Sequence, residues 1–417
     1  GGYSMFERVF KLSEHKTTVK TEVMAGITTF MTMAYILAVN PSVLGSTGMD
    51  TTAVLLATAL ASCLGTLCMA FMANLPFALS AGMGLNAFMA YTVVAGYGYS
   101  WQVALLAVFI EGLLFIVLSL TNVREAIFNA IPLTLKKGVS VGIGLFIAFI
   151  GLQNSGLCVD SATLVGIISF PENFHTAGIC ALLTLIGLFF TAVFYTRKMK
   201  GAILYGILLT WILGMLCQVT GLYVPTPDAG FYSLFPSWGM TDFSKLGLTF
   251  GQCFNVDFSA VGIVNFIVVI FSFLFVDIFD TLGTLIGVAT KAKMLDKDGK
   301  LPGIKPALLA DSIATSAGAI LGTSTTTTFV ESASGVAVGG RTGLTALVTG
   351  ILFLVSTLFA PIFTAIPSFA TAPALIMVGF LMVGTVTEIN FDLDNLTESI
   401  PAYLAIIAMP LFYSISE

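Results

Sequence analysis

Residues 322–335 read GTSTTTTFVESASG, a threonine run that leads into Glu331 between two long apolar stretches. Residues 75–86 read LPFALSAGMGLN and hold the corresponding place in the first half of the chain. Threonine, proline and glycine are poor helix formers, so each segment is expected to contain an extended stretch followed by a short helix. Lipid cannot pair the N–H and C=O groups of extended backbone, so such backbone must be buried in protein or line a cavity. The paired segments therefore predict a binding site within a membrane protein. The alternative is a pair of hairpins outside the membrane, or two kinked packing helices.

The composition is that of a polytopic membrane protein. The chain has 417 residues, of which 57% are hydrophobic and only 9% are charged, where a soluble domain carries about 25% charged residues. The mean hydropathy is +0.99, so there is too little polar surface to cover a soluble globule. The net charge of −5 argues against a nucleic-acid partner. The six cysteines are far apart, and we expect no metal site, no disulfide framework and no cofactor.

Apolar runs between polar residues predict thirteen membrane segments. The connection 223–257 divides them into seven and six, so the second half enters the membrane with the opposite orientation. This arithmetic predicts an all-α protein built from two inverted repeats, with short extended stretches in segments 3 and 10. The predicted segments are 23–45, 52–73, 79–96, 101–121, 137–153, 176–196, 201–222, 258–289, 306–322, 329–340, 343–361, 372–387 and 399–415.

Lysine and arginine are concentrated in connections that fall on one side of the predicted membrane. The positive-inside rule makes this side cytoplasmic, which places the N-terminus in the cytoplasm. The connections 154–175 and 223–257 on the opposite side contain a single basic residue, Lys245. The basic residues of the cytoplasmic side are Arg8, Lys11, Lys16, Lys20, Arg124, Lys136, Lys137, Arg197, Lys198, Lys200, Lys291, Lys293, Lys297, Lys300, Lys305 and Arg341.

Five acidic residues fall inside predicted segments: Glu111, Asp277, Asp280, Asp311 and Glu331. A charge at the bilayer centre costs about 2.5–3.5 kcal/mol on insertion scales, so each acid is a functional candidate. Carboxylates accept hydrogen bonds, so a site that contains them suits cations, protons or neutral molecules with several N–H groups. It suits anions poorly.

Asp280 and Glu331 are the strongest candidates for a substrate site. Asp277 and Asp280 are three residues apart and share a helix face, and proton exchange is a natural use for such a pair. Glu331 stands where the threonine run becomes a helix, and Asn86 holds the comparable place in the first half. The alternative for these acids is structural capping of broken helices.

Four long motifs closely resemble those of the AzgA-like purine permeases, a family within the nucleobase–ascorbate transporter superfamily. The resemblance runs from about Phe6 to the end of the chain. The motifs are GITTFMTMAY at 26–35 with Asn40 and Pro41, GMGLNAF at 82–88, FDTLGTLIGV at 279–288 and ESASGVAVGGRTGLTA at 331–346.

The resemblance implies fourteen segments arranged as a core domain and a gate domain. It assigns 23–121 (segments 1–4) and 258–361 (segments 8–11) to the core, and 137–222 (segments 5–7) and 372–417 to the gate. Residues 1–22 become a cytoplasmic tail, and 223–257 an extracellular connection. The chain ends at Glu417, where the family continues into a fourteenth segment, so we expect that the last segment is missing from this sequence.

The resemblance also implies a function and a set of site residues. Members of the family import adenine, guanine, hypoxanthine or related purines together with protons across the plasma membrane, by alternating access, and commonly form homodimers. By position, Asp280 and Glu331 resemble the acids that hold the base, and Asn86 a polar residue needed for transport. Met83, Gly84, Phe329 and Val330 correspond to ligand contacts, and Thr284 to a histidine in distant relatives. Proton coupling is expected at Asp280, Glu331 and Asp277.

Two other functions remain as alternatives. An anion transporter of the same fold, of the sulfate or bicarbonate type, would favour cationic or neutral residues at the broken helices, and Glu331 opposes it. An intramembrane enzyme is disfavoured because no histidine falls within a predicted segment, and no Ser–His or Cys–His pair is evident.

Overall fold

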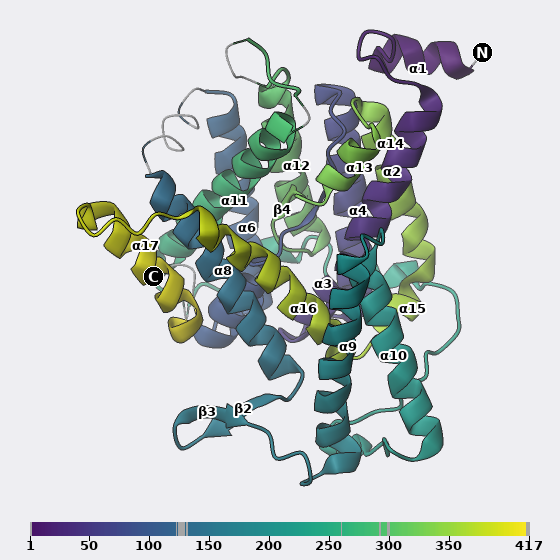
Figure 1. The fold of residues 1–417 in the computed structure, drawn as a ribbon, viewed down its shortest axis with the longest axis vertical. Helices are drawn as coiled ribbons and strands as arrows, with labels where there is room; N and C mark the ends of the chain where they lie inside the picture. The colour runs from purple at the N-terminus through teal and green to yellow at the C-terminus, as the bar shows by residue number, and fades with distance from the viewer. Residues whose placement is uncertain are drawn as a thin grey trace. The chain divides into compact units, whose positions relative to one another are not determined.

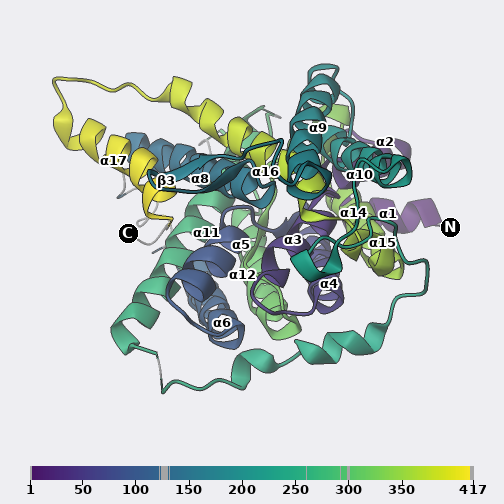
Figure 2. The same cartoon turned by 90° about the horizontal axis from the view of Figure 1, so that it is seen from below.

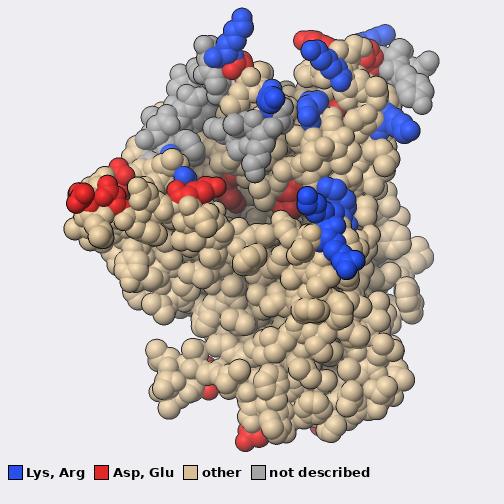
Figure 3. Space-filling view, in the orientation of Figure 1, with Lys and Arg blue, Asp and Glu red and all other residues tan. Residues whose placement is uncertain are grey.

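A computed structural model of the chain describes residues 2–121, 123, 130, 132–259, 261–291, 293–297 and 301–413. Arg124, Lys300, Ser416 and Glu417, which entered the predictions above, lie outside the described residues. Within the described part, ten helices are long and apolar enough to cross a membrane, and Leu85–Gly96 and Leu396–Phe412 are shorter apolar helices. Each of the thirteen predicted segments contains at least one helix (Figure 1), although 23–45 holds two helices and 79–96 begins with a strand. On the face drawn in Figure 3, charged side chains form a few small groups on an otherwise uncharged surface.

The chain forms two compact units. Unit 1 consists of Gly1–Ile131 and Thr241–Ala360, and unit 2 of Pro132–Met240 and Pro361–Ile415. Each unit therefore combines a part of the first half of the chain with a part of the second half. The elements of unit 1 are α1 (Gly2–Phe10), α2 (Val19–Met33), α3 (Ile36–Gly45), α4 (Thr51–Cys68), η1 (Met69–Ala73), β1 (Leu79–Ala81), α5 (Leu85–Ala87), η2 (Phe88–Gly96), α6 (Trp101–Ser119), η5 (Phe243–Leu248), η6 (Gln252–Phe254), α11 (Ile263–Lys291), α12 (Ile304–Leu321), β4 (Thr326–Thr328), α13 (Ser332–Val338), α14 (Gly343–Ser356) and η7 (Thr357–Phe359).

Side-chain caps begin three of the long helices of unit 1. Thr18 accepts a hydrogen bond from the Thr21 amide before α2, Asp50 from Ala53 before α4, and Ser100 from Val103 before α6. These bonds satisfy amides that lack a partner in the first turn of a helix. In a membrane protein the caps fix where an apolar run starts as a helix, because the run itself carries no boundary signal.

The two interrupted segments form extended strands that pair with each other. β1 and β4 are antiparallel, with Leu79 opposite Thr328 and Ala81 opposite Thr326. The Gly82 amide extends the ladder by donating to the Thr325 carbonyl at 2.9 Å. Both strands are fully buried, so their backbone groups pair inside the protein as the bilayer requires. The extended stretches in segments 3 and 10 are thereby confirmed, and they occupy equivalent places in two inverted repeats.

The helices α4 and α6 are both neighbours of α12 in unit 1 (Figure 2), and small residues let them approach it closely. A Cβ built on Gly112 of α6 would lie 2.2 Å from Ser316 Oγ of α12, and one built on Gly65 of α4 would lie 2.6 Å from Ala314 Cβ. Because membrane helices gain little from burying apolar side chains away from lipid, such close packing is a main source of their association.

Unit 2 is a set of helices packed around α8 and α16. Gly142 of α8 lies against Ala405 of α17, and Gly144 of α8 against Gly379 of α16. Its elements are α8 (Leu133–Asn154), β2 (Cys158–Ser161), β3 (Leu164–Ile167), η3 (Phe174–Gly178), α9 (Ile179–Thr196), α10 (Ala202–Thr220), η4 (Pro227–Ala229), α15 (Ala360–Thr364, whose first residue belongs to unit 1), α16 (Ser368–Val383), η8 (Gly384–Glu388) and α17 (Leu396–Phe412).

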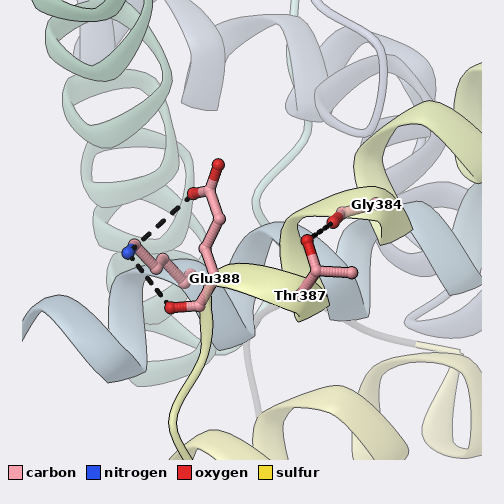
Figure 4. Close-up of polar contacts among 4 residues, drawn as sticks. Gly384, Thr387 and Glu388 are labelled. Carbon is pink, nitrogen blue, oxygen red and sulfur yellow. Dashed lines mark hydrogen bonds and ion pairs between the residues drawn. The ribbon is translucent and has the colours of Figure 1, made fainter.

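An ion pair joins α8 to η8 within unit 2. Lys137 Nζ lies 3.8 Å from Glu388 Oε2 and donates to the Glu388 carbonyl at 3.3 Å. Figure 4 shows Glu388 at the end of the turn in which the Thr387 hydroxyl donates to the Gly384 carbonyl. Both charged side chains are partly exposed, so this pair contributes little to stability.

The structure adds three features that the sequence did not predict. The first predicted segment, 23–45, is broken at Ala34 and Tyr35 into α2 and α3. The connection 154–175 contains an antiparallel hairpin, β2–β3. The connection 223–257 is divided between the two units after Met240.

Candidate functional site

Glu331 stands between the strand β4 and the helix α13, as the sequence predicted. The three buried threonines of β4 are β-branched and favour extended backbone, and Glu331 is the first residue of the helical turn that follows. Its carboxylate oxygen Oε1 accepts a 2.7 Å hydrogen bond from the hydroxyl of Tyr35, which is 1% exposed. Tyr35 lies at the break between α2 and α3. A residue at the junction of two helices in the first half of the chain therefore holds the acid of the second half.

Asp280 of α11 lies within electrostatic range of Glu331. The Asp280 side chain is half-buried. Thr284 lies one helical turn further along α11 and is also half-buried, so it shares a face with Asp280. Asp280 and Thr284 thus share one face of α11, and Asp280 is in electrostatic range of Glu331 at the β4–α13 segment.

The first-half segment contributes backbone more than side chains. Gly84 has φ +91° and ψ −50°, a conformation that favours glycine, and it turns the chain from β1 into the helix that begins at Leu85. Met83 beside it is half-buried, and its sulfur lies 3.7 Å from the Asn86 amide nitrogen. This turn is the counterpart of the turn at Glu331.

Asn86 is fully buried and belongs to a polar network. Its amide donates to Asn40 Oδ1 at 3.1 Å, and Asn40 in turn donates to Thr58 at 2.7 Å and to Thr323 at 2.9 Å. The hydroxyls of Thr58 and Thr323 are also hydrogen-bonded to each other at 2.9 Å. Asn40 therefore ties the helix after β1 to the chain that enters β4. A predicted ligand-binding role for Asn86 stays a prediction, since its amide already has this partner.

Asp277 lies in a different, fully buried cluster with Asp311 and Glu111. The Thr281 hydroxyl is within hydrogen-bonding distance of Asp311 Oδ2 and, at 3.2 Å, of Asp277 Oδ1. A hydroxyl has one proton, so it donates to one of them at a time. Asp311 Oδ2 also accepts from the Thr328 amide at 3.2 Å, which anchors β4 to α12.

Glu111 completes the acidic cluster from α6. Both of its carboxyl oxygens, and Oδ2 of Asp277, are buried without a hydrogen-bond partner among the described residues, and the Glu111 and Asp277 carboxyl groups interact electrostatically. Two carboxyl groups hydrogen-bond to each other only when one of them holds a proton. The cluster therefore offers a place where a proton can reside, one helical turn from Asp280.

Phe329 and Val330 follow the end of β4 and differ in their exposure to solvent. Phe329 is 5% exposed and its amide donates to the Ala78 carbonyl at 2.9 Å, which continues the β1–β4 ladder, whereas Val330 is 60% exposed. Their predicted contacts with a ligand stay predictions.

The sequence reasoning missed Tyr35 and Asn40 as members of the site. Both occur in a quoted motif, but neither carries a charge, and the Tyr35–Glu331 contact joins residues 296 positions apart. The available signal was an aromatic hydroxyl and an amide inside an otherwise apolar segment, since buried polar groups need partners.

Acidic side chains beside paired, broken segments in two inverted repeats are typical of the binding sites of secondary transporters. The comparisons with known proteins agree. The xanthine/uracil permease model, described as "Permease family", matches residues 20–416. The chain therefore belongs to this family of permeases, which confirms the resemblance to the purine permeases indicated by its motifs.

The sequence relatives are permeases, and the match covers nearly the whole length of this chain and most of theirs. Adenine permease AdeP from Escherichia coli (strain K12) is 42% identical over 100% of this chain and 88% of its own. Guanine/hypoxanthine permease PbuG from Bacillus subtilis (strain 168) is 46% identical over 98% of this chain and 90% of its own.

Solved structures share the fold at low sequence identity. The transmembrane domain of a cyanobacterium bicarbonate transporter, BicA, has a TM-score of 0.68 at 16% identity and covers 95% of this chain and 96% of its own. The murine anion transporter Slc26a9 in an inward-facing state has a TM-score of 0.60 at 12% identity, covering 95% and 66%. These two likenesses concern the fold alone.

Proposed function

We propose that the chain is a proton-coupled secondary transporter that imports purine nucleobases of the adenine, guanine and hypoxanthine class. The names of the sequence relatives support the substrate class, since they are adenine and guanine/hypoxanthine permeases. The single observation that carries the proposal is that two acids, Asp280 and Glu331, lie within electrostatic range of each other, with Glu331 at the end of the paired strands.

The chemistry of a purine matches this pair. The base is flat and largely uncharged, and its edges carry N–H donors and ring-nitrogen acceptors. Carboxylate oxygens of Glu331 or Asp280 accept the N–H groups, and the Thr284 hydroxyl is able to donate to a ring nitrogen. Phe329 and Val330 supply apolar surface for the face of the ring. Met83 and Gly84 bring the turn after β1 to the same ligand.

Proton coupling uses the neighbouring acids. A proton taken up at Asp280 or Glu331, with Asp277 as the next acid on α11, removes a buried charge that would resist movement through the membrane. Moving one charge through 100 mV is worth about 2.3 kcal/mol. At about 1.4 kcal/mol per tenfold change, this drives an accumulation of roughly 50-fold.

Unit 1, which holds all the site residues, is proposed to act as the core domain, and unit 2 as the gate against which it moves in alternating access. The positive-inside rule supports a cytoplasmic N-terminus, and the plasma membrane is the proposed location. A homodimer through the gate is the proposed assembly.

Competition experiments test the substrate class. The protein is expressed in cells that lack their own purine permeases, and uptake of radiolabelled adenine is measured with excess guanine, hypoxanthine, xanthine, uracil or bicarbonate. We expect competition by at least one other purine and none by bicarbonate. Inhibition by bicarbonate alone, with labelled bicarbonate taken up instead, would establish the anion transporter and overturn the proposal.

Coupling is tested in proteoliposomes with an imposed pH gradient. Wild-type protein is expected to accumulate the purine, and a protonophore to abolish the accumulation. Asp280→Asn is expected to remove proton-driven accumulation, because an amide cannot take up the proton. Unchanged proton-driven uptake by Asp280→Asn would remove Asp280 from the mechanism.

A further inference from the structure

Tyr35 contacts the proposed substrate acid from a position fixed by its own backbone. It is the residue at which α2 has ended and α3 begins, with φ −55° and ψ −25°. Its carbonyl accepts hydrogen bonds from the amides of Ala38 and Val39, each at 3.0 Å. The ring is 1% exposed. The phenol hydroxyl therefore reaches Glu331 Oε1 from a rigid and buried base.

Three contacts in a row dock α13 onto α2. Gly335 lies against Thr29, so closely that a Cβ on Gly335 would be 2.0 Å from Thr29 Oγ1. The Ser334 hydroxyl donates to Thr32 Oγ1 at 3.0 Å, and Tyr35 donates to Glu331 at 2.7 Å. The residues of α2 and its end are spaced by three, so they lie on one helix face. The Tyr35–Glu331 bond is the end of this row and the only one of the three that engages a carboxylate.

A hydrogen bond to one carboxylate oxygen orients the other. A free glutamate side chain has several rotatable bonds, and fixing them when a ligand binds costs up to about 2 kcal/mol. A donor that already holds Oε1 removes much of that cost and fixes the direction in which Oε2 points. Phenol-to-carboxylate bonds are charge-assisted and among the stronger hydrogen bonds of proteins.

We propose, on the basis of the proposed function, that Tyr35 is a positioning and specificity-determining residue. It holds Glu331 so that Oε2 faces the N–H edge of the purine. The ligand preference follows from this geometry. A purine that keeps its N–H donors pairs with the oriented oxygen, whereas an N-methylated purine leaves that oxygen unpaired in a buried place. Tyr35 thus makes the site selective for purines with a free N–H group, although it does not need to touch them.

The test uses Tyr35→Phe, which removes the hydroxyl and keeps the ring. Uptake of radiolabelled hypoxanthine is measured, with its N1-methyl and N9-methyl derivatives as competitors. We expect KM for hypoxanthine to rise about 10- to 100-fold, the range for loss of one hydrogen bond to a charged group. The maximal rate should stay within about threefold of the wild-type rate. Discrimination against whichever methyl derivative competes less well with hypoxanthine in the wild type should fall about tenfold. A KM within twofold of wild type, with unchanged discrimination, would overturn the inference.

A double-mutant cycle separates positioning from packing. If Tyr35 acts through Glu331, Tyr35→Phe has little further effect once Glu331→Gln is present, so the two effects on binding are not additive. Ser334→Ala is the matched control, because it removes the bonds of the Ser334 hydroxyl to Thr32 and to the Glu331 main-chain carbonyl and keeps both partners of the Tyr35–Glu331 bond. An equal rise of KM in Ser334→Ala, or additive losses in the cycle, would show that the row merely packs the helix.

The remaining outcomes are also decisive. If Tyr35→Phe gives no monodisperse protein, Glu331→Asp is used instead. The shorter side chain places its carboxylate too far from the Tyr35 hydroxyl for a hydrogen bond, so the same loss of discrimination is expected. Retained discrimination would refute the inference. A wild-type protein that transports no purine would refute the proposed function and this inference with it. If the wild-type protein transports purines and Tyr35→Phe has the same KM and the same discrimination, the inference is refuted and the proposed function stands.

Discussion

Gly335→Ala is expected to lift α13 from α2 and to weaken both stability and substrate affinity. The new Cβ would lie 2.0 Å from Thr29 Oγ1 and 2.8 Å from the Ala25 carbonyl oxygen. The Thr29 hydroxyl is buried and donates to that same carbonyl at 2.9 Å, so turning it away loses a hydrogen bond worth about 1 kcal/mol. The carbonyl belongs to the backbone of α2 and cannot turn, so α13 must move. Overpacking of this kind costs about 1–3 kcal/mol.

The assay is thermal unfolding of the purified protein in detergent, combined with purine uptake. A loss of about 2 kcal/mol lowers the midpoint by a few degrees in a protein of this size. KM should rise as well, because Glu331 is the residue that directly precedes α13. Gly384→Ala is the control, since a Cβ there meets nothing within 4 Å. Adding Thr29→Ala to Gly335→Ala should restore part of the midpoint. Equal midpoints and KM values for Gly335→Ala and the Gly384→Ala control would refute the packing argument.

Three further substitutions probe other contacts. Thr281→Val deprives the buried acids Asp277 and Asp311 of their shared donor and should cost about 1–3 kcal/mol, whereas Thr281→Ser keeps the hydroxyl; equal thermal midpoints for the two would contradict this role. Asn40→Leu removes three bonds of the buried network at once and should destabilise by at least about 2 kcal/mol, so an unchanged midpoint in thermal unfolding would show that the network is dispensable. Lys137→Met breaks a partly exposed pair and should change stability by less than about 1 kcal/mol; a larger drop in the midpoint would mean that the pair is shielded from solvent.

The broken segments were predictable because their causes are local. A threonine run, a proline and several glycines all disfavour a helix at the same place in two halves, and lipid excludes unpaired backbone. Their pairing as β1 and β4 was not predicted, because the register between Leu79 and Thr328 depends on tertiary packing across the whole of unit 1.

The acids of the site were likewise visible in the sequence, whereas their uncharged partners were not. Asp280 and Glu331 stand out because charge is rare in membrane segments. Tyr35 gives no such signal, and neither glycine nor proline marks the break between α2 and α3 at which it lies; the one proline nearby, Pro41, is inside α3. Partners of this kind become evident only when residues distant in the sequence are brought together.

Equilibrium binding of radiolabelled hypoxanthine to the purified protein tests the central claim most directly. Asp280→Asn and Glu331→Gln each remove one charged acceptor, and each should raise Kd by at least about tenfold, the lower end for one hydrogen bond to a charged group. Glu388→Gln, an exposed acid of unit 2, should bind like wild type. Wild-type affinity in both Asp280→Asn and Glu331→Gln would show that these two acids do not hold the base.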